Sequence, residues 1–208
     1  MRRACLFALL ASLLAPLLAA CAGPERHIPY AQSWADHTGQ LEAFEHWEAT
    51  GKLALRSPRG GESGNLVWRQ AGAQTDIFLS GPLGVAPTNM HSDGRWLQVK
   101  QGKETSTVDL NNPDEVTTAT GWDFPLKALP YWIKGLPSPS LKLQRLVQDT
   151  ATGGASVLEQ AGWEVRYEQY RRFEQMNLPT RIVITDGEVQ ATVLVKQWRS
   201  DTQGHLND

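Results

Sequence analysis

The sequence predicts a mostly β (α+β) fold: a single curved antiparallel sheet forming a half-open barrel of about ten or eleven strands, with helices covering a hydrophobic cavity. Three observations support it. Most segments after residue 46 alternate apolar and polar residues, as strands with one buried face do. Turn formers separate these segments at short intervals. A stretch with helical spacing, residues 112–137, interrupts the strands and can cover the concave face.

The first twenty residues have the pattern of an export signal. Arg2 and Arg3 precede an apolar run over residues 6–18, which is shorter than the roughly 20 residues needed to span a bilayer. Leu-Ala-Ala-Cys at residues 18–21 resembles the lipobox of bacterial lipoproteins, in which the cysteine is acylated and becomes the first mature residue. An ordinary secretory signal with a chance cysteine is the alternative. The pattern favours lipid attachment at Cys21, and Ala22 after it resembles the sorting pattern for the outer membrane.

We therefore divide the chain into a cleaved signal peptide (1–20), a lipidated cysteine with a tether (21–30), one β-barrel domain (31–200) and a polar tail (201–208). Cys5 lies in the signal, so Cys21 is the sole mature cysteine, which excludes an intramolecular disulfide and a cysteine metal cluster. We expect no cofactor apart from the N-acyl diglyceride on Cys21. Removal of the signal lowers the formal charge from −2 to about −4, which argues against a nucleic-acid partner.

The N-terminal half of the domain predicts one helix and then strands. Ser33 is a suitable N-cap for a helix over residues 33–47. Alternation predicts strands over 47–57, 65–70 and 74–79. Pro87 weakens the next segment, so residues 86–91 are expected to form at best an edge strand. Two more strands are predicted over 95–100 and 104–110.

The remaining segments return from helices to strands. Asn112 and Pro113 predict the start of a short helix that ends by residue 121. A second, very apolar helix is predicted over residues 124–137, and Pro130 should kink or interrupt it. Strands then follow over residues 162–170, 181–185 and 188–198, and Leu178-Pro179 leads into the second of them.

The turn Gly81-Pro82-Leu83-Gly84 follows the predicted strand 74–79. Leu83 stands where a turn normally carries a small polar residue, and two glycines give little bulk to cover it. From this stretch alone, Leu83 either folds back onto the core or projects into solvent.

Motifs for catalysis are not found in the sequence. The segment around Ser63 lacks the spacing of a nucleophile elbow, and no phosphate loop or dinucleotide fingerprint occurs. His37 and His46 are nine positions apart, not the four that place two ligands on one helical face, and the histidines are interpreted as satisfied or solvent-exposed. We therefore expect no enzyme activity. Seven of the eight tryptophans lie between Trp47 and Trp198, where they fill a core or line a lipid pocket.

In order along the chain, several segments resemble the outer-membrane lipoprotein receptors of the LolB family, part of the lipoprotein localisation system of Gram-negative bacteria. They span nearly all of the mature chain. The segments are the lipobox, Trp47 through Gly51-Lys-Leu-Ala, Gly64-Asn-Leu-Val-Trp-Arg-Gln70, Gly81-Pro-Leu-Gly84, Leu129-Pro-Tyr-Trp-Ile-Lys-Gly-Leu-Pro137, Gly162-Trp-Glu-Val-Arg-Tyr167, Leu178-Pro-Thr-Arg-Ile and Trp198.

The resemblance implies a monomeric receptor, anchored in the outer membrane by lipid and facing the periplasm. It implies that the receptor takes lipoproteins from the soluble carrier LolA by their acyl chains and inserts them into the inner leaflet. In that family an outward leucine at the position of Leu83, in the loop with Gly81, Pro82 and Gly84, acts in transfer to membrane phospholipid. For the acyl-chain cavity we choose apolar residues of the predicted inner face: Leu53, Leu55, Leu66, Trp68, Ile77, Leu79, Trp132, Ile133, Trp163 and Val165.

Three other functions remain open at this point. The chain is alternatively an envelope lipoprotein that binds lipid or another hydrophobic ligand without transferring protein. A structural lipoprotein with a solid barrel is the second, and a hydrolase whose catalytic residues come from distant positions is the third.

Overall fold

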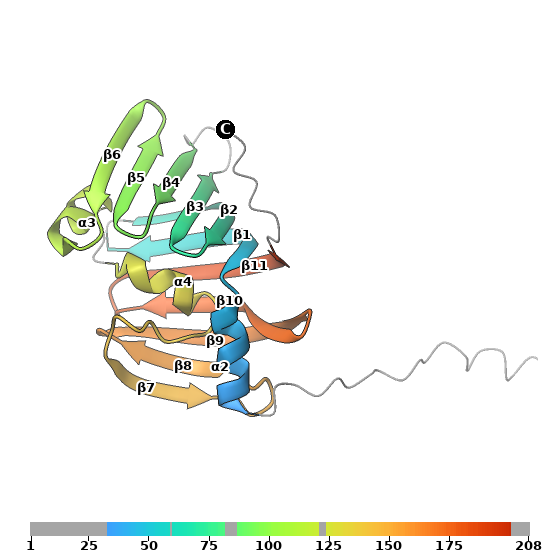
Figure 1. Ribbon diagram of the computed structural model, residues 1–208. Helices are drawn as coiled ribbons and strands as arrows, with labels where there is room; N and C mark the ends of the chain where they lie inside the picture. The colour runs from blue at the N-terminus through green and yellow to red at the C-terminus, as the bar shows by residue number, and fades with distance from the viewer. Residues whose placement is uncertain (1–32, 59, 82–86, 121–123, 201–208) are drawn as a thin grey trace, which may run out of the picture.

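The computed structural model describes residues 33–58, 60–81, 87–120 and 124–200, which form one antiparallel sheet of 11 strands. The strand order is β6-β5-β4-β3-β2-β1-β11-β10-β9-β8-β7 (Figure 1). The first and last strands meet in the middle, while β6 and β7 form two edges that, in the described part of the chain, do not pair with each other. The sheet is therefore open, and the prediction of a single half-open sheet is confirmed.

The strands are β1 (His46–Ser57), β2 (Gly60–Ala71), β3 (Gln74–Ser80), β4 (Thr88–Ser92), β5 (Trp96–Gln101), β6 (Glu104–Asp109), β7 (Leu143–Gln148), β8 (Ala155–Gln160), β9 (Trp163–Phe173), β10 (Met176–Thr185) and β11 (Gln190–Ser200).

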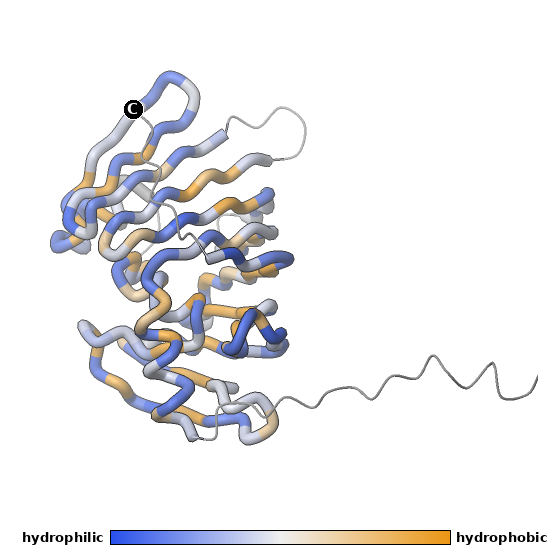
Figure 2. The backbone as a smooth tube through the Cα atoms, turned by 45° about the vertical axis from the view of Figure 1, so that its right-hand side comes forward, coloured by the Kyte–Doolittle hydropathy of each residue, from blue (hydrophilic) through white to orange (hydrophobic). Residues whose placement is uncertain are grey.

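One face of the sheet carries the apolar side chains. In β9, Trp163, Val165 and Tyr167 are buried, whereas Arg166 and Glu168 are exposed. Figure 2 shows a similar alternation of hydrophobic and hydrophilic residues along other strands. The alternation places the apolar residues on the inner face, and the helices cover that face. Helices α2 (Trp34–Ala43) and α4 (Leu129–Trp132) cross it in Figure 1.

Helix α2 begins as predicted but ends earlier. The Ser33 side chain accepts a hydrogen bond from the backbone N–H of Asp36, which confirms the N-cap. The helix stops at Ala43, and Trp47 belongs to β1. Trp47 packs between Trp68 and Trp198, with ring centroids 5.4 Å and 5.3 Å away. Its alternation with Ala49 fits the strand, so extending the helix to residue 47 was wrong.

Of the two helices predicted in the middle of the chain, the first is confirmed and the second is shorter than predicted. Helix α3 (Pro113–Thr120) starts after Asn112, whose Oδ1 accepts from the N–H of Glu115, as predicted. The helix expected over residues 124–137 is instead a 3₁₀ turn, η2 (Leu126–Ala128), followed directly by α4. Pro130 occupies the first turn of α4, where its missing N–H costs no hydrogen bond.

Two strand predictions needed correction. Strand β4 is not an edge, because it pairs with β3 on one side and β5 on the other. Pro87 precedes its first ladder residue, Thr88, and so removes no ladder hydrogen bond. Strands β7 and β8 were not predicted at all.

The centre of the sheet bends at a β-bulge between β1 and β11. Thr50 pairs with Gln197 but Gly51 pairs with Val195, which leaves Lys196 as an extra residue. A bulge of this kind increases the local bend and twist. The backbones come so close that a Cβ at Gly51 would lie 1.8 Å from the carbonyl oxygen of Leu194. Only glycine fits this approach.

We expect Gly51→Ala to lower the free energy of unfolding by about 2–4 kcal/mol, because the backbones must separate at the bulge. The matched control is Gly39→Ala in α2, where an added Cβ meets nothing within 4 Å. That change should stabilise the protein by about 0.5–1 kcal/mol through helix propensity. Urea unfolding of both variants measures the difference. Equal stabilities would contradict the close approach.

Candidate functional site

The segment from Leu126 to Leu141 forms a roof over the inner face of the sheet. The buried amide of Gln160, on β8, holds this roof. Its Oε1 accepts from Trp132 Nε1 (2.9 Å) and Ser138 N (2.8 Å), and its Nε2 donates to Ser138 O (3.0 Å) and Leu141 O (2.9 Å). All four hydrogen-bonding positions of the amide are therefore used.

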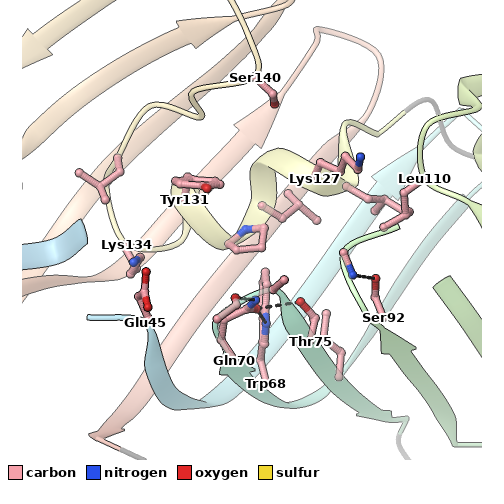
Figure 3. A pocket seen from close by; sticks show the side chains of 18 of the residues that line it. Glu45, Trp68, Gln70, Thr75, Ser92, Leu110, Lys127, Tyr131, Lys134 and Ser140 are labelled. Carbon is pink, nitrogen blue, oxygen red and sulfur yellow. Dashed lines mark hydrogen bonds between the residues drawn. The ribbon is translucent and has the colours of Figure 1, made fainter. Parts of the chain in front are cut away.

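A cavity of about 690 Å³ lies between the roof and strands β2 to β5 (Figure 3). Its volume falls within the roughly 300–1,000 Å³ of small-molecule sites. Trp68, Ile77 and Met90 contribute apolar wall. The lining also includes the exposed residues Glu45 and Lys127, which mark where the cavity meets solvent.

A second, smaller cavity of about 110 Å³ adjoins the first, and every residue that lines it is apolar. The two share Trp68, Ile77, Met90, Leu97, Leu126 and Leu129. The second cavity extends along the inner face to Leu79, near the end of β3, and to residues of β10 and β11. The smaller cavity is thus wholly apolar, and the larger cavity beside it adds polar and charged lining residues.

Seven of the ten residues chosen for the acyl-chain cavity line the smaller cavity: Leu53, Leu55, Leu66, Trp68, Ile77, Leu79 and Ile133. Trp132, Trp163 and Val165 line neither cavity and pack in the core. The Trp132 indole bonds Gln160, and the Trp163 ring lies 4.3 Å from Phe124 between centroids. Alternation identifies the inner face, but it does not say where the roof touches that face.

Lys134 is a site residue that the sequence reasoning missed. It is buried, and its Nζ donates to the carbonyl oxygens of Leu41 (2.7 Å) and Phe44 (2.9 Å), at the C-terminus of α2. Burial lowers the pKa of Lys134 to about 8, although Glu45 and Glu42 nearby favour the charged form. A single lysine inside the apolar run of residues 129–137 was the available signal.

Lys134 predicts a specific dependence of stability on pH. Its folded-state pKa lies below the ordinary value of 10.5, so between about pH 8 and 10.5 the unfolded chain binds a proton that the folded chain has released. Raising the pH through this window should therefore stabilise the wild type relative to Lys134→Met, by at most about 3 kcal/mol. Urea unfolding of both proteins across the window measures this difference. A difference that stays constant with pH would contradict a buried ammonium.

His37 corrects the interpretation of the histidines. His91 is exposed, with Nδ1 2.7 Å from Asp76 Oδ1, and His46 is exposed too. His37 is buried on α2, and its Nε2 has no hydrogen-bond partner among the described residues. Burial lowers the pKa of His37 and so favours the neutral ring. It packs beside Trp34, with ring centroids 6.3 Å apart.

Cys21, the predicted lipid-attachment residue, and the loop residues Pro82, Leu83 and Gly84 lie outside the described residues. Gly81 is described and is half-buried directly after β3. Leu79 pairs with Thr88, so the connection from β3 to β4 begins and ends beside Leu79. That end of the sheet carries the apolar end of the cavity.

In the described part of the chain, no three His, Cys, Asp or Glu side chains are grouped so that they could hold a metal ion. None of its helices has the length and apolar content to cross a membrane. What the arrangement offers chemically is apolar binding space with a polar opening.

Comparison with known proteins gives a consistent result. The sequence model of the family described as outer membrane lipoprotein LolB matches residues 45–198. The outer-membrane lipoprotein LolB of Stutzerimonas stutzeri is 34% identical over 200 residues, which cover 92% of this chain and 94% of the relative. The LolB of Chromohalobacter salexigens is 32% identical over 195 residues, 91% of this chain and 89% of the relative.

Two crystal structures have a similar fold. One is described as an outer membrane lipoprotein-sorting protein domain from Vibrio parahaemolyticus, with a TM-score of 0.56 and 10% identity, covering 83% of this chain and 94% of that chain. The other is a LolA superfamily protein from Nitrosomonas europaea, with a TM-score of 0.51, 10% identity and the same coverage of 83% and 94%. At such low identity the likeness concerns the fold alone.

Proposed function

The chain belongs to the LolB family of outer-membrane lipoprotein receptors in lipoprotein localisation, and from this we propose that it takes lipoproteins from the periplasmic carrier LolA and inserts them into the inner leaflet of the outer membrane. Receptors of this family are not enzymes, and the chain is an outer-membrane lipoprotein. The cargo is held by its acyl chains, and the final acceptor is membrane phospholipid.

The apolar cavity beneath the roof is the observation that carries this proposal. An acyl chain needs a continuous apolar surface, and the smaller cavity is lined by apolar residues alone. The larger cavity continues it to exposed residues, so a chain has a route from solvent to the interior. Each methylene that leaves water contributes about 0.8 kcal/mol, so even a partly inserted chain is held.

Direction comes from relative affinity, because no step requires ATP or a covalent intermediate. The acyl chains exchange one apolar environment for another on passing from carrier to receptor, and they gain most on entering a bilayer. In our proposal the receptor stays at the membrane through acylated Cys21, since two or more chains anchor stably. In the same proposal, residues 1–20 are the signal peptide that is cleaved before Cys21, and residues 21–30 form the tether. Residues 31–200 form the lipoprotein-binding domain, and residues 201–208 are a polar tail.

Filling the cavity should block cargo loading. Met90 lines both cavities, so Met90→Trp should occupy space that an acyl chain needs and lower transfer about tenfold. Asn89→Trp is the matched control, because Asn89 is exposed on the other face of the same strand. The assay loads LolA with a labelled lipoprotein, adds the receptor and follows the label. Unchanged transfer by Met90→Trp would exclude the cavity from the function. Binding of lipid without any transfer by the wild type would favour a simple lipid-binding lipoprotein.

We assign release of cargo into the membrane to Leu83. Inserting one leucine contributes about 1.5–3 kcal/mol, which is too little to anchor the domain but enough to bias an encounter with the bilayer. Leu83→Glu should leave folding and uptake from LolA intact and reduce incorporation into liposomes by about tenfold or more. Leu83→Met, which keeps an apolar side chain, should incorporate normally. Normal incorporation by Leu83→Glu would remove Leu83 from the mechanism.

A further inference from the structure

Three polar side chains form a row across the inner face of β2, β3 and β4. Gln70 on β2 pairs with Thr75 on β3, and Thr75 pairs with Ser92 on β4. All three line the larger cavity (Figure 3). Only 5% of the surface of Gln70 and 4% of that of Ser92 is exposed, so both are buried polar residues and not part of a solvated rim. We call Gln70, Thr75 and Ser92 the polar row.

Apolar residues begin immediately beyond the polar row. Moving two positions along each strand leads to the next residues on the same face, which are Trp68, Ile77 and Met90. Two strand positions span about 6–7 Å. A ligand that reaches from the opening into the smaller cavity therefore passes the polar row before it meets wholly apolar walls.

The acceptor capacity of the Gln70 amide is already used. Its Oε1 accepts from Trp68 Nε1 (3.1 Å) and from Thr75 Oγ1 (2.8 Å). Its Nε2 donates one hydrogen to the carbonyl oxygen of Gly72 (2.9 Å). The amide carries two such hydrogens, and among the described residues the second has no acceptor.

Ser92 is similar to Gln70. Its Oγ accepts from the backbone N–H of Gly94 (3.0 Å), and among the described residues its own hydroxyl hydrogen has no acceptor. The polar row thus offers N–H and O–H donors to the cavity. Buried donors without acceptors are costly, so the row is suited to a ligand that supplies acceptor oxygens.

The charges around the opening favour a neutral acceptor over an anion. Glu42 and Glu45 line the same cavity as Lys127 and Lys134, so two carboxylates balance two ammonium groups. Lys134 also donates two of its three ammonium hydrogens to backbone carbonyls. A phosphate or a free carboxylate would meet the two glutamates, whereas an ester carbonyl carries no charge and accepts hydrogen bonds.

We propose that the polar row binds the ester carbonyls that join acyl chains to the glyceryl group of the cargo cysteine. This inference rests on the proposed function, because it assigns a place to one part of the same ligand. The ester linkages stop at Gln70 and Ser92, and the hydrocarbon continues past Trp68 into the apolar space. The row thereby fixes how deep the chains enter and distinguishes esterified chains from plain hydrocarbon.

The test compares two ligands that differ at the linkages. One is a lipopeptide with a diacylglyceryl cysteine, and the other is its dialkyl ether analogue, which has the same chains without the ester carbonyls. Displacement of a fluorescent fatty-acid probe from the detergent-solubilised full chain measures both affinities. Wild type should bind the ester about three- to tenfold more tightly, as expected for one or two hydrogen bonds.

Two variants connect this preference to the polar row. Gln70→Glu keeps an oxygen for Trp68 and Thr75 but replaces the N–H donor, and Ser92→Ala removes the hydroxyl. Each should lower the ratio of ester affinity to ether affinity towards one. This ratio is insensitive to a general loss of stability, and either variant suffices if the other fails to fold. Gln98→Glu, an exposed change on β5, is the matched control and should keep the wild-type ratio.

The outcomes separate the inference from the function on which it depends. If wild type binds neither lipopeptide, the proposed function fails. If it binds both equally, the polar row has no role in linkage binding, although the function stands. A preference that survives in both variants also overturns the assignment. Diacyl and dialkyl phosphatidylglycerol form the last arm, because an ester preference seen with the phospholipid alone would assign the row to membrane lipid and not to cargo.

Discussion

Gln160 makes four hydrogen bonds inside the apolar core, and they hold the roof of the cavity above the sheet. Apolar surfaces normally close over empty space, because interiors pack as densely as organic crystals. Here the roof is fixed in position by polar bonds at Trp132, Ser138 and Leu141. Moving it inward to fill the cavity would break them and leave buried groups unsatisfied, at about 1–3 kcal/mol each. The cavity therefore stays open because its roof is held by directional bonds.

Lys134 connects the same roof to a second element. Its ammonium reaches the last carbonyls of α2, so helix α2, the start of β1 and the roof form one unit. Burying this charge is unfavourable and lowers the pKa of Lys134. The two carbonyl acceptors offset part of that cost. Trp47, at the start of β1, packs between Trp68 and Trp198 and so joins this unit to the core. The wall of the cavity and the packed core thus share residues, which explains why alternation alone does not separate them.

Much of the fold follows from local patterns, because each side of a strand has a different environment. The inner faces of β1, β2, β3 and β9 could be predicted from alternation, and the starts of α2 and α3 from their capping residues. Strand β7 could not, since it is an edge with mostly exposed residues and lacks a buried face to set a pattern, and the buried residues of β8 do not strictly alternate and include the polar Gln160. The prediction of one helix over residues 124–137 was wrong for another reason. These apolar residues pack against the sheet from a 3₁₀ turn and a single helical turn, with Pro130 in the first turn of α4.

The candidate site divides in the same way. Apolar lining residues such as Ile77 and Leu79 follow from the face they occupy. Gln70, Ser92, Lys134 and Gln160 do not, because a polar residue on an inner face is read as an exception until its partners are known. The partners of Gln70 and Ser92 lie within five residues of them along the chain, and those of Lys134 and Gln160 lie in distant segments. Sequence spacing says nothing of such distant contacts.

Polarity along β3 gives the cavity a direction. Thr75, near the start of the strand, belongs to the polar row, whereas Leu79, near its end, lines the wholly apolar part. These two positions are about 13 Å apart along an extended strand. If the linkages of a bound lipid lie at Thr75, its chain ends lie towards Leu79, where the connection that contains Leu83 leaves the sheet. In our proposal Leu83 brings this end to the membrane, so the hydrocarbon passes from cavity to bilayer with the least exposure to water.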